Sequence, residues 1–283
     1  MVSKTPLLEF TRKAVTLANK EVISYLHKED PTATTNLVCI HGNCTSSDCY
    51  IPFIKKFEKA NIYAPDLRGY GDSTYKTPVF TLTDFASDVK NFIDELKITN
   101  PILIGWSFGG AVVQQFLIDY PDAVKKAILL ASVGATGLSY RARQLTTGEL
   151  VSNPFFLALE KELKEGTGVI HEGSFYSYKS EMTTEEFQTF IAQALKQRNY
   201  RRTMVITGDM NLGKHFPKIK AEVLVIHGTK DVNVPYGIGQ ELVELHLKEK
   251  AKLKSIKGAD HFLLSTYLEE TCLIISDFLS IVT

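Results

Sequence analysis

The sequence predicts an α/β fold with a mostly parallel, twisted sheet, helices on both faces and an inserted helical cap. Short apolar runs alternate with amphipathic stretches along most of the chain, as strands and helices do in α/β proteins. The apolar runs lack the every-second-residue polarity of half-exposed strands, which indicates a sheet covered on both faces. The alternation stops after Ser132 and resumes at Val223, which predicts an insertion between two strands.

The part of the chain up to Ser132 begins with two β-rich runs around 18–21, which predict an antiparallel hairpin. Buried strands and helices then take turns. Residues 81–84, Thr-Leu-Thr-Asp, resemble a capping box at the start of a helix. The expected elements are hairpin strands 14–17 and 22–26, strand 37–40, helix 48–59, strand 61–64, helix 82–96, strand 101–104, helix 110–118 and strand 127–131.

Regular α/β order returns after the insertion. The expected elements are strand 223–226, helix 239–247, strand 252–256 and a last helix over 268–279. A chain of 283 residues with 44% hydrophobic content can form one large domain with an inserted subdomain. We therefore expect a core domain of residues 1–132 and 217–283, and a helical cap of residues 133–216.

Composition excludes several classes of function. Thirty-two basic and thirty-two acidic residues balance, so sequence-independent nucleic-acid binding has no basic patch to rest on. The sequence has no apolar run of about eighteen residues that would insert in a membrane, and residues 1–10 lack the apolar core typical of a secretory signal. Its four cysteines form neither a Cys-x-x-Cys pair nor a zinc spacing, and we interpret them as free thiols. These patterns predict a cytoplasmic protein without a metal or other cofactor; they do not indicate its oligomeric state.

The stretch Gly105-Trp-Ser-Phe-Gly109 carries the strongest chemical signal. It stands between an expected strand and an expected helix, the context in which Gly-x-Ser-x-Gly is a nucleophile elbow. The tight turn lifts the Ser107 hydroxyl above the sheet and directs the helix N-terminus at the reacting group. A glycine-rich turn with an ordinary capping serine is the alternative.

A serine nucleophile needs a base, and the base needs an acid. Asp231 follows the strand over 223–226, and His261 follows the strand over 252–256. The order Ser, Asp, His along the chain is the one expected for this arrangement of strands. Asp231 as a loop cap and His261 as a structural histidine stay open as alternatives. Asp260 is interpreted as a loop-stabilising hydrogen-bonding residue.

The chain resembles an α/β-hydrolase of the capped serine esterase or lactonase type. The resemblance rests on five stretches: His41-Gly-Asn43, the loop from Asp66 to Ser73, Gly105–Gly109, Asp231, and Gly258-Ala-Asp-His261. It implies that the backbone N–H groups of Asn43 and Phe108 form the oxyanion hole. The loop at His41 is also similar to that of haloalkane dehalogenases, but those enzymes need an aspartate where Ser107 stands.

The sequence thus predicts a serine hydrolase that acts on a small to medium carboxylic ester or lactone through an acyl-enzyme, with no cofactor and no metal. An acyltransferase or a C–C bond hydrolase would use the same triad, and a ligand-binding receptor with residual hydrolase activity is a further alternative. Aromatic residues could line the substrate pocket or belong to the core. The candidate pocket residues are Trp106, Phe155, Phe156 and Tyr176.

Overall fold

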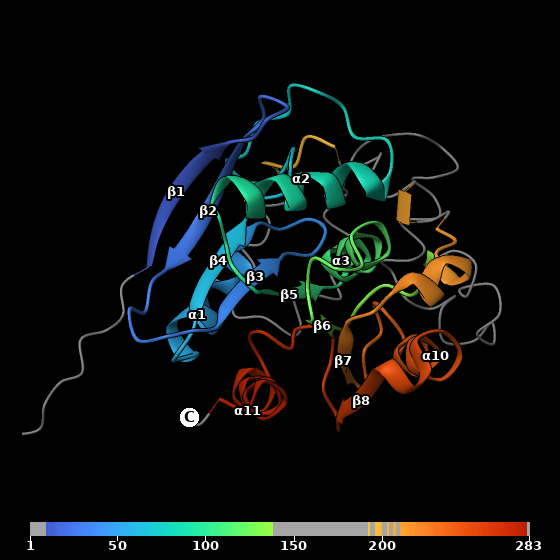
Figure 1. Ribbon diagram of the computed structural model, residues 1–283. Helices are drawn as coiled ribbons and strands as arrows, with labels where there is room; N and C mark the ends of the chain where they lie inside the picture. Colours follow the sequence, from blue (N-terminus) through green and yellow to red (C-terminus); the bar gives the residue numbers. More distant parts are fainter. Residues whose placement is uncertain are drawn as a thin grey trace, which may run out of the picture.

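The computed structural model describes residues 10–137, 192, 196–199, 203, 206–207 and 210–281. Most of the expected cap, including Phe155, Phe156 and Tyr176, lies outside these residues, so the division at 133 and 216 stays a prediction. Within the described part, eight strands form one sheet in the order β1-β2-β4-β3-β5-β6-β7-β8 (Figure 1). The strands are β1 (Phe10–Thr16), β2 (Val22–Lys28), β3 (Asn36–Ile40), β4 (Asn61–Pro65), β5 (Pro101–Trp106), β6 (Lys126–Leu130), β7 (Glu222–Gly228) and β8 (Ala251–Ile256).

The sheet is mostly parallel, as the sequence predicts. Strands β4, β3, β5, β6, β7 and β8 run parallel to one another, and the β1–β2 hairpin joins β4 antiparallel. The helices are α1 (Ile51–Lys56), α2 (Leu82–Glu95), α3 (Phe108–Asp119), α10 (Tyr236–Glu241) and α11 (Leu268–Leu279).

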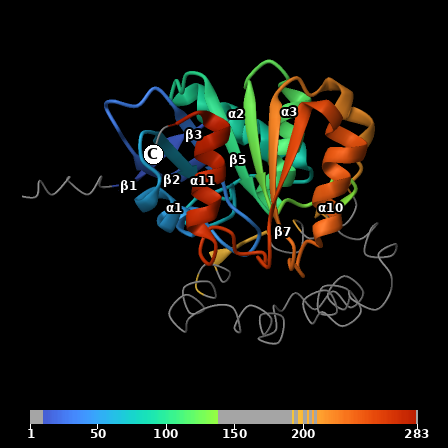
Figure 2. The ribbon, with the colours of Figure 1, turned by 90° about the horizontal axis from the view of Figure 1, so that it is seen from below.

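Helices cover both faces of the sheet (Figure 2). Helices α2, α3 and α10 pack on one face, and α1 and α11 pack on the other. Alternate side chains of each central strand enter opposite layers: Val38 of β3 joins the first core, and Leu37 and Cys39 join the second. Burial on both faces explains why the inner parts of these strands, such as residues 37–40, are apolar at successive positions.

The helices differ from the sequence prediction mainly at their ends, most of all α1 and α10. The helix expected over 48–59 is a short 3₁₀ turn followed by α1, which ends at Lys56. The buried Lys28 ammonium of β2 binds the carbonyls of Ile54 and Phe57, and this cation at the helix C-terminus satisfies carbonyls that would otherwise lack partners. The helix expected from 239 begins earlier, at Tyr236, directly after Pro235.

Candidate active site

The candidate site residues follow the carboxyl ends of parallel strands. Ser107 follows β5, Asp231 follows β7 by three residues, and His261 follows β8 by five. The loop that contains Asn43 follows β3. Because these strands are parallel and share one sheet, their carboxyl ends meet at one edge, where open α/β sheets bind ligands.

The turn from β5 to α3 consists of Ser107 alone. Its backbone has φ 54° and ψ −117°, a region that L-residues rarely occupy and that costs about 1–3 kcal/mol. Hydrogen bonds from its N–H to the carbonyl of Leu130 (2.9 Å) and from the N–H of Val133 to its carbonyl (3.2 Å) hold this conformation. Ser107 is half-buried, whereas Trp106 and Phe108 on either side are buried. The strained backbone therefore presents the serine side chain at the end of the strand.

The glycines of the elbow allow a close approach that no other residue permits. A Cβ atom on Gly105 would lie 2.5 Å from the carbonyl oxygen of Gly109. A Cβ atom on Gly109 would lie 2.1 Å from the carbonyl oxygen of Ile40, at the end of β3. Helix α3 therefore starts directly against the strand that leads into the Asn43 loop.

Asp231 and His261 form a buried pair. The Nδ1 atom of His261 lies 2.8 Å from Oδ2 of Asp231, and the other carboxylate oxygen accepts the N–H groups of Asn233 (2.9 Å) and Val234 (2.8 Å). Asp231 thus both caps its own loop, through Asn233 and Val234, and binds His261. Burial alone would raise the pKa of this carboxyl, but the facing histidines His261 and His227 and the hydrogen bonds hold the pKa well below its usual range.

A second buried histidine reaches the same carboxylate. The Nε2 atom of His227 lies 2.7 Å from the carbonyl oxygen of Val234 and 3.3 Å from Oδ2 of Asp231. Because a carbonyl only accepts, Nε2 carries the proton. Within the described residues the other ring nitrogen, Nδ1, has no hydrogen-bond partner and faces Gly239. Sequence reasoning did not place His227 at this site. Its position four residues before Asp231 is the signal that could have predicted the contact.

Trp106 connects the elbow to the histidine loop. Its indole Nε1 donates a hydrogen bond to the carbonyl of His261 (2.9 Å), and its ring lies 5.4 Å from the His261 ring. A Cβ atom on Gly42 would lie 2.9 Å from the Trp106 ring and 3.3 Å from Cβ of Ser107. The loop after β3, the elbow and the histidine loop are therefore in direct contact. Trp106 is 5% exposed, and its assignment to a substrate pocket stays a prediction.

The two expected oxyanion donors belong to the elbow and to the loop after β3. Phe108 is the first residue of α3, so its N–H belongs to the first turn, where helices leave backbone donors without intrahelical acceptors. Asn43 follows Gly42 in the loop after β3. The side-chain oxygen of Asn43 accepts hydrogen bonds from the Tyr70 hydroxyl (2.9 Å) and from Nε2 of Gln197 (2.7 Å). Sequence reasoning identified neither of these two partners.

The loop after β3 is also fixed from the side of β4. His41 donates from Nδ1 to the carbonyl of Gly42 (2.7 Å) and accepts the N–H of Leu67 at Nε2 (2.9 Å). Burial lowers the pKa of His41, which keeps the ring neutral. The buried Asp66 carboxylate accepts the N–H of Ser47 (2.8 Å). Both ring nitrogens of His41 are thus used in structural hydrogen bonds.

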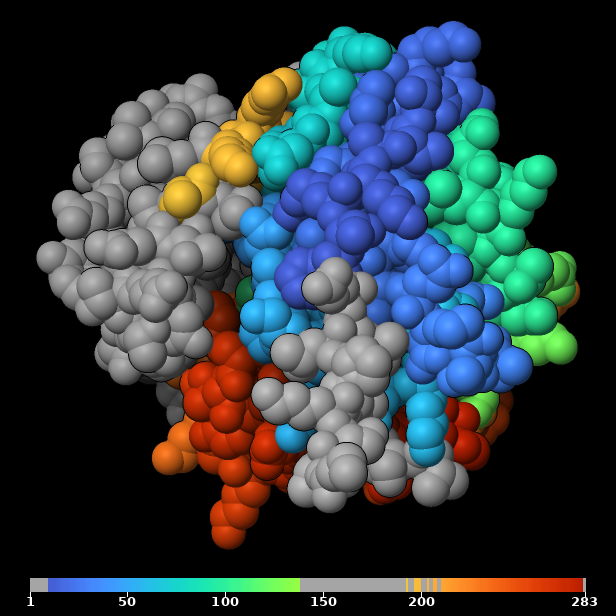
Figure 3. Space-filling view, turned by 90° about the vertical axis from the view of Figure 1, so that its left-hand side faces the viewer, coloured from blue at the N-terminus to red at the C-terminus, as the bar shows by residue number. Residues whose placement is uncertain are grey.

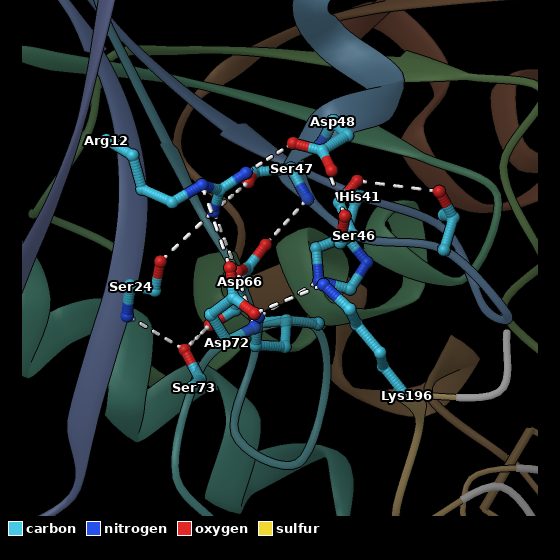
Figure 4. Close-up of polar contacts among 12 residues, drawn as sticks. Arg12, Ser24, His41, Ser46, Ser47, Asp48, Asp66, Asp72, Ser73 and Lys196 are labelled. Carbon is cyan, nitrogen blue, oxygen red and sulfur yellow. Dashed lines mark hydrogen bonds and ion pairs between the residues drawn. The ribbon is translucent and has the colours of Figure 1, made fainter. Parts of the chain in front are cut away.

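Figure 4 shows how Asp66 joins a wider polar network. Arg12, on β1, reaches Asp66 (3.1 Å), and it also contacts Ser24 and Asp48. The loop that begins at Asp66 also contains Arg68, which pairs with Asp88 at 2.6 Å. The reason is that Arg68 is buried against α2, where Asp88 supplies a nearby carboxylate.

The described residues contain no cluster of three or more histidine, cysteine, aspartate or glutamate side chains suited to a metal ion. Across the same ranges, no helix is long and apolar enough to cross a membrane.

Comparison with known proteins gives a consistent result. The alpha/beta hydrolase fold family matches residues 35–266. An uncharacterized hydrolase of Bacillus subtilis is 26% identical over 253 residues, which are 86% of this chain and 87% of that protein. A bifunctional esterase/perhydrolase of Acinetobacter calcoaceticus is 25% identical over 240 residues, 81% of this chain and 86% of that protein. Among solved structures, an esterase from Exiguobacterium antarcticum superposes with a TM-score of 0.74 at 20% identity, covering 95% of this chain and all of that one.

Proposed function

The chain belongs to the alpha/beta hydrolase fold family, and from that premise we propose that it is a serine hydrolase of carboxylic esters or lactones. The observation that carries the proposal is the buried Asp231–His261 pair, whose histidine loop is tied by Trp106 to the strained turn at Ser107. The similarity to an esterase/perhydrolase over most of the chain supports an ester as the substrate class.

In the proposed reaction the Ser107 hydroxyl attacks the ester carbonyl while His261 takes its proton. Asp231 keeps the His261 ring in the tautomer that bears its proton on Nδ1 and stabilises the imidazolium. The low pKa of Asp231 suits this role, because the carboxyl stays ionised while the ring is charged.

The backbone N–H groups of Asn43 and Phe108 stabilise the negative charge on the tetrahedral oxygen, each worth about 3 kcal/mol when well aimed. His261 then returns its proton to the leaving alcohol, which leaves an acyl group on Ser107. Water activated by His261 hydrolyses this acyl-enzyme and restores the free serine.

The test combines a fluorophosphonate probe with a panel of p-nitrophenyl esters and lactones. We expect the probe to label Ser107, and we expect Ser107→Ala to abolish both labelling and ester turnover. Ser255→Ala, which removes an exposed serine of β8, serves as the matched control and should behave as the unchanged protein. Full esterase activity in Ser107→Ala would refute the proposal.

The same panel separates the alternatives that use this triad. An added alcohol that is converted into a new ester would indicate an acyltransferase. Cleavage of a carbon–carbon bond in a diketone, with esters left intact, would indicate a C–C bond hydrolase. Tight ligand binding without turnover of any substrate would favour a receptor.

A further inference from the structure

A short segment near the end of the expected cap contacts two loops of the core. Residues 196–199 lie against the loop after β4 (Figure 3), and one of them also reaches the loop after β3. The contacts are Lys196 Nζ to Asp72 Oδ1 (3.2 Å), Gln197 to Asn43 and Cys44, Arg198 N–H to the Gly69 carbonyl (2.8 Å), and Asn199 Nδ2 to the Arg68 carbonyl (3.2 Å).

Gln197 is the member of this segment that binds the expected oxyanion loop. Its Oε1 accepts the backbone N–H of Cys44 (3.1 Å), and its Nε2 donates to the side-chain oxygen of Asn43 (2.7 Å). The orientation of the amide follows from chemistry: a backbone N–H only donates, so the oxygen of Gln197 must face Cys44 and its nitrogen must face Asn43. Gln197 therefore holds residue 43 by its side chain and by the peptide that follows it.

The backbone held in this way is strained. Cys44 has a φ of 58°, a value that few residues other than glycine adopt. Such conformations persist only where surrounding contacts determine them. The hydrogen bond from Cys44 N–H to Gln197 acts on the strained residue itself, directly after Asn43.

We propose that Gln197 is a positioning residue that sets the direction of the Asn43 N–H toward the oxyanion. The inference rests on the proposed function, since it requires that Asn43 supplies an oxyanion donor. Loss of the Gln197 contacts would let Cys44 relax and rotate the donor away from the carbonyl oxygen. The substrate would still bind, because Gln197 acts on transition-state stabilisation through Asn43.

The test compares Gln197→Met with Lys196→Met in the full chain. Methionine keeps the length of the side chain without its amide. The control removes the neighbouring contact to Asp72, which does not involve Asn43 or Cys44. Removing a whole oxyanion donor costs about 10²–10³ in kcat, so a misdirected donor in Gln197→Met should lower kcat about tenfold or more. We expect KM to stay within about twofold, fluorophosphonate labelling to slow in parallel with kcat, and Lys196→Met to leave both rates unchanged.

The pH dependence of kcat in Gln197→Glu distinguishes a hydrogen-bonding role of Gln197 from a packing role. When protonated, a glutamate can accept the Cys44 N–H and donate to Asn43, as glutamine does; when ionised, it cannot donate. The groups that Gln197 contacts are the uncharged Asn43, Cys44 and Asn199. Its chain neighbours Lys196 and Arg198 are cationic, and Asp72 pairs with Lys196. The kcat of Gln197→Glu relative to the unchanged protein should therefore rise as pH falls through the pKa of the new carboxyl, while the relative kcat of Gln197→Met stays level.

The outcomes separate the two proposals. If fluorophosphonate fails to label Ser107 in the unchanged protein, the proposed function is wrong. If Ser107 is labelled, but Gln197→Met keeps its kcat and its labelling rate, the inference about Gln197 is wrong. A loss of kcat accompanied by a fall in Tm that Lys196→Met does not share, together with a pH-independent Gln197→Glu, would also overturn it, because Gln197 would then be a packing residue.

Discussion

Helix α3 packs closely against β3 at Gly109, so adding one methyl group there, in Gly109→Ala, tests whether this contact positions the elbow. In Gly109→Ala the new Cβ would lie 2.1 Å from the carbonyl oxygen of Ile40 and 2.6 Å from that of His41. Contacts below 3.0 Å are essentially never seen for a Cβ atom, so the separation must open by about 0.9 Å, the difference between 3.0 and 2.1 Å. Both obstacles are backbone atoms and cannot rotate away. The start of α3 must therefore move away from the end of β3.

This movement displaces the Phe108 N–H from the Asn43 loop. A misplacement of about 1 Å can cost about 100-fold in rate, so we expect kcat to fall about 100-fold. The fold should change much less. Overpacking costs about 1–3 kcal/mol, and alanine in place of glycine in a helix returns about 1 kcal/mol. The net loss of about 0–2 kcal/mol corresponds to a fall in Tm of at most about 8 °C.

The assay measures kcat on the best p-nitrophenyl ester together with Tm. Gly213→Ala is the matched control, because its Cβ would also meet an atom closer than 3.0 Å, Cε1 of His246 at 2.8 Å. That atom belongs to a side chain that can rotate, so the control should keep full activity. A Gly109→Ala protein with kcat within threefold of the unchanged protein would refute the claim that this contact sets the position of the Phe108 donor.

Two further substitutions test the carboxylate of Asp231 and the histidine beside it. Asp231→Asn should lower kcat by about 10⁴, as in triads where the acid is replaced by its amide, and single-turnover kinetics would measure the loss. The lowered pKa of Asp231 stabilises the folded protein above the unfolded pKa of about 4, and this stabilisation is lost as pH falls toward the folded value. The Tm difference between the two proteins should therefore shrink below about pH 4; a difference that grows there would contradict this assignment. His227→Phe should lower stability by about 1–3 kcal/mol because the buried Val234 carbonyl loses its donor. His227→Gln, which keeps an N–H, should restore the stability, and a His227→Phe protein as stable as the unchanged one would show that the hydrogen bond to Val234 is not needed.

The central strands could be predicted from the sequence because both of their faces are buried. The apolar runs at Leu37, Leu103 and Val223 contribute side chains to both cores in turn, and this requirement keeps successive positions of each run apolar. The ends of helices could not be predicted in the same way. Helix α1 ends where Lys28, a residue of another strand, binds its last carbonyls, and no pattern within the helix announces that contact.

The positions of the candidate catalytic residues could also be predicted from the order of the strands. Parallel strands bring their carboxyl ends to one edge, so the residue after each strand is a candidate before any distance is known. This rule predicted that Asp231 and His261 would be neighbours, and Oδ2 of Asp231 lies 2.8 Å from Nδ1 of His261. It does not predict Arg12, which enters its network from the exposed face of the β1 hairpin.

Gln197 escaped prediction because its contact joins residues 154 positions apart in the sequence and depends on a backbone conformation. An asparagine, a cysteine and a glutamine carry no spacing rule that would connect them. The contact matters because Cys44 has a φ of 58°, and a residue in such a conformation needs surrounding contacts to hold it there. The loop after β3 is held from two sides, by His41 and Asp66 toward β4 and by Gln197 toward the expected cap. The first side consists of contacts within the expected core domain. The second involves a segment of the expected cap. If Gln197 positions the Asn43 N–H as proposed, sequence changes in that segment will alter the rate of the proposed reaction without touching the proposed triad.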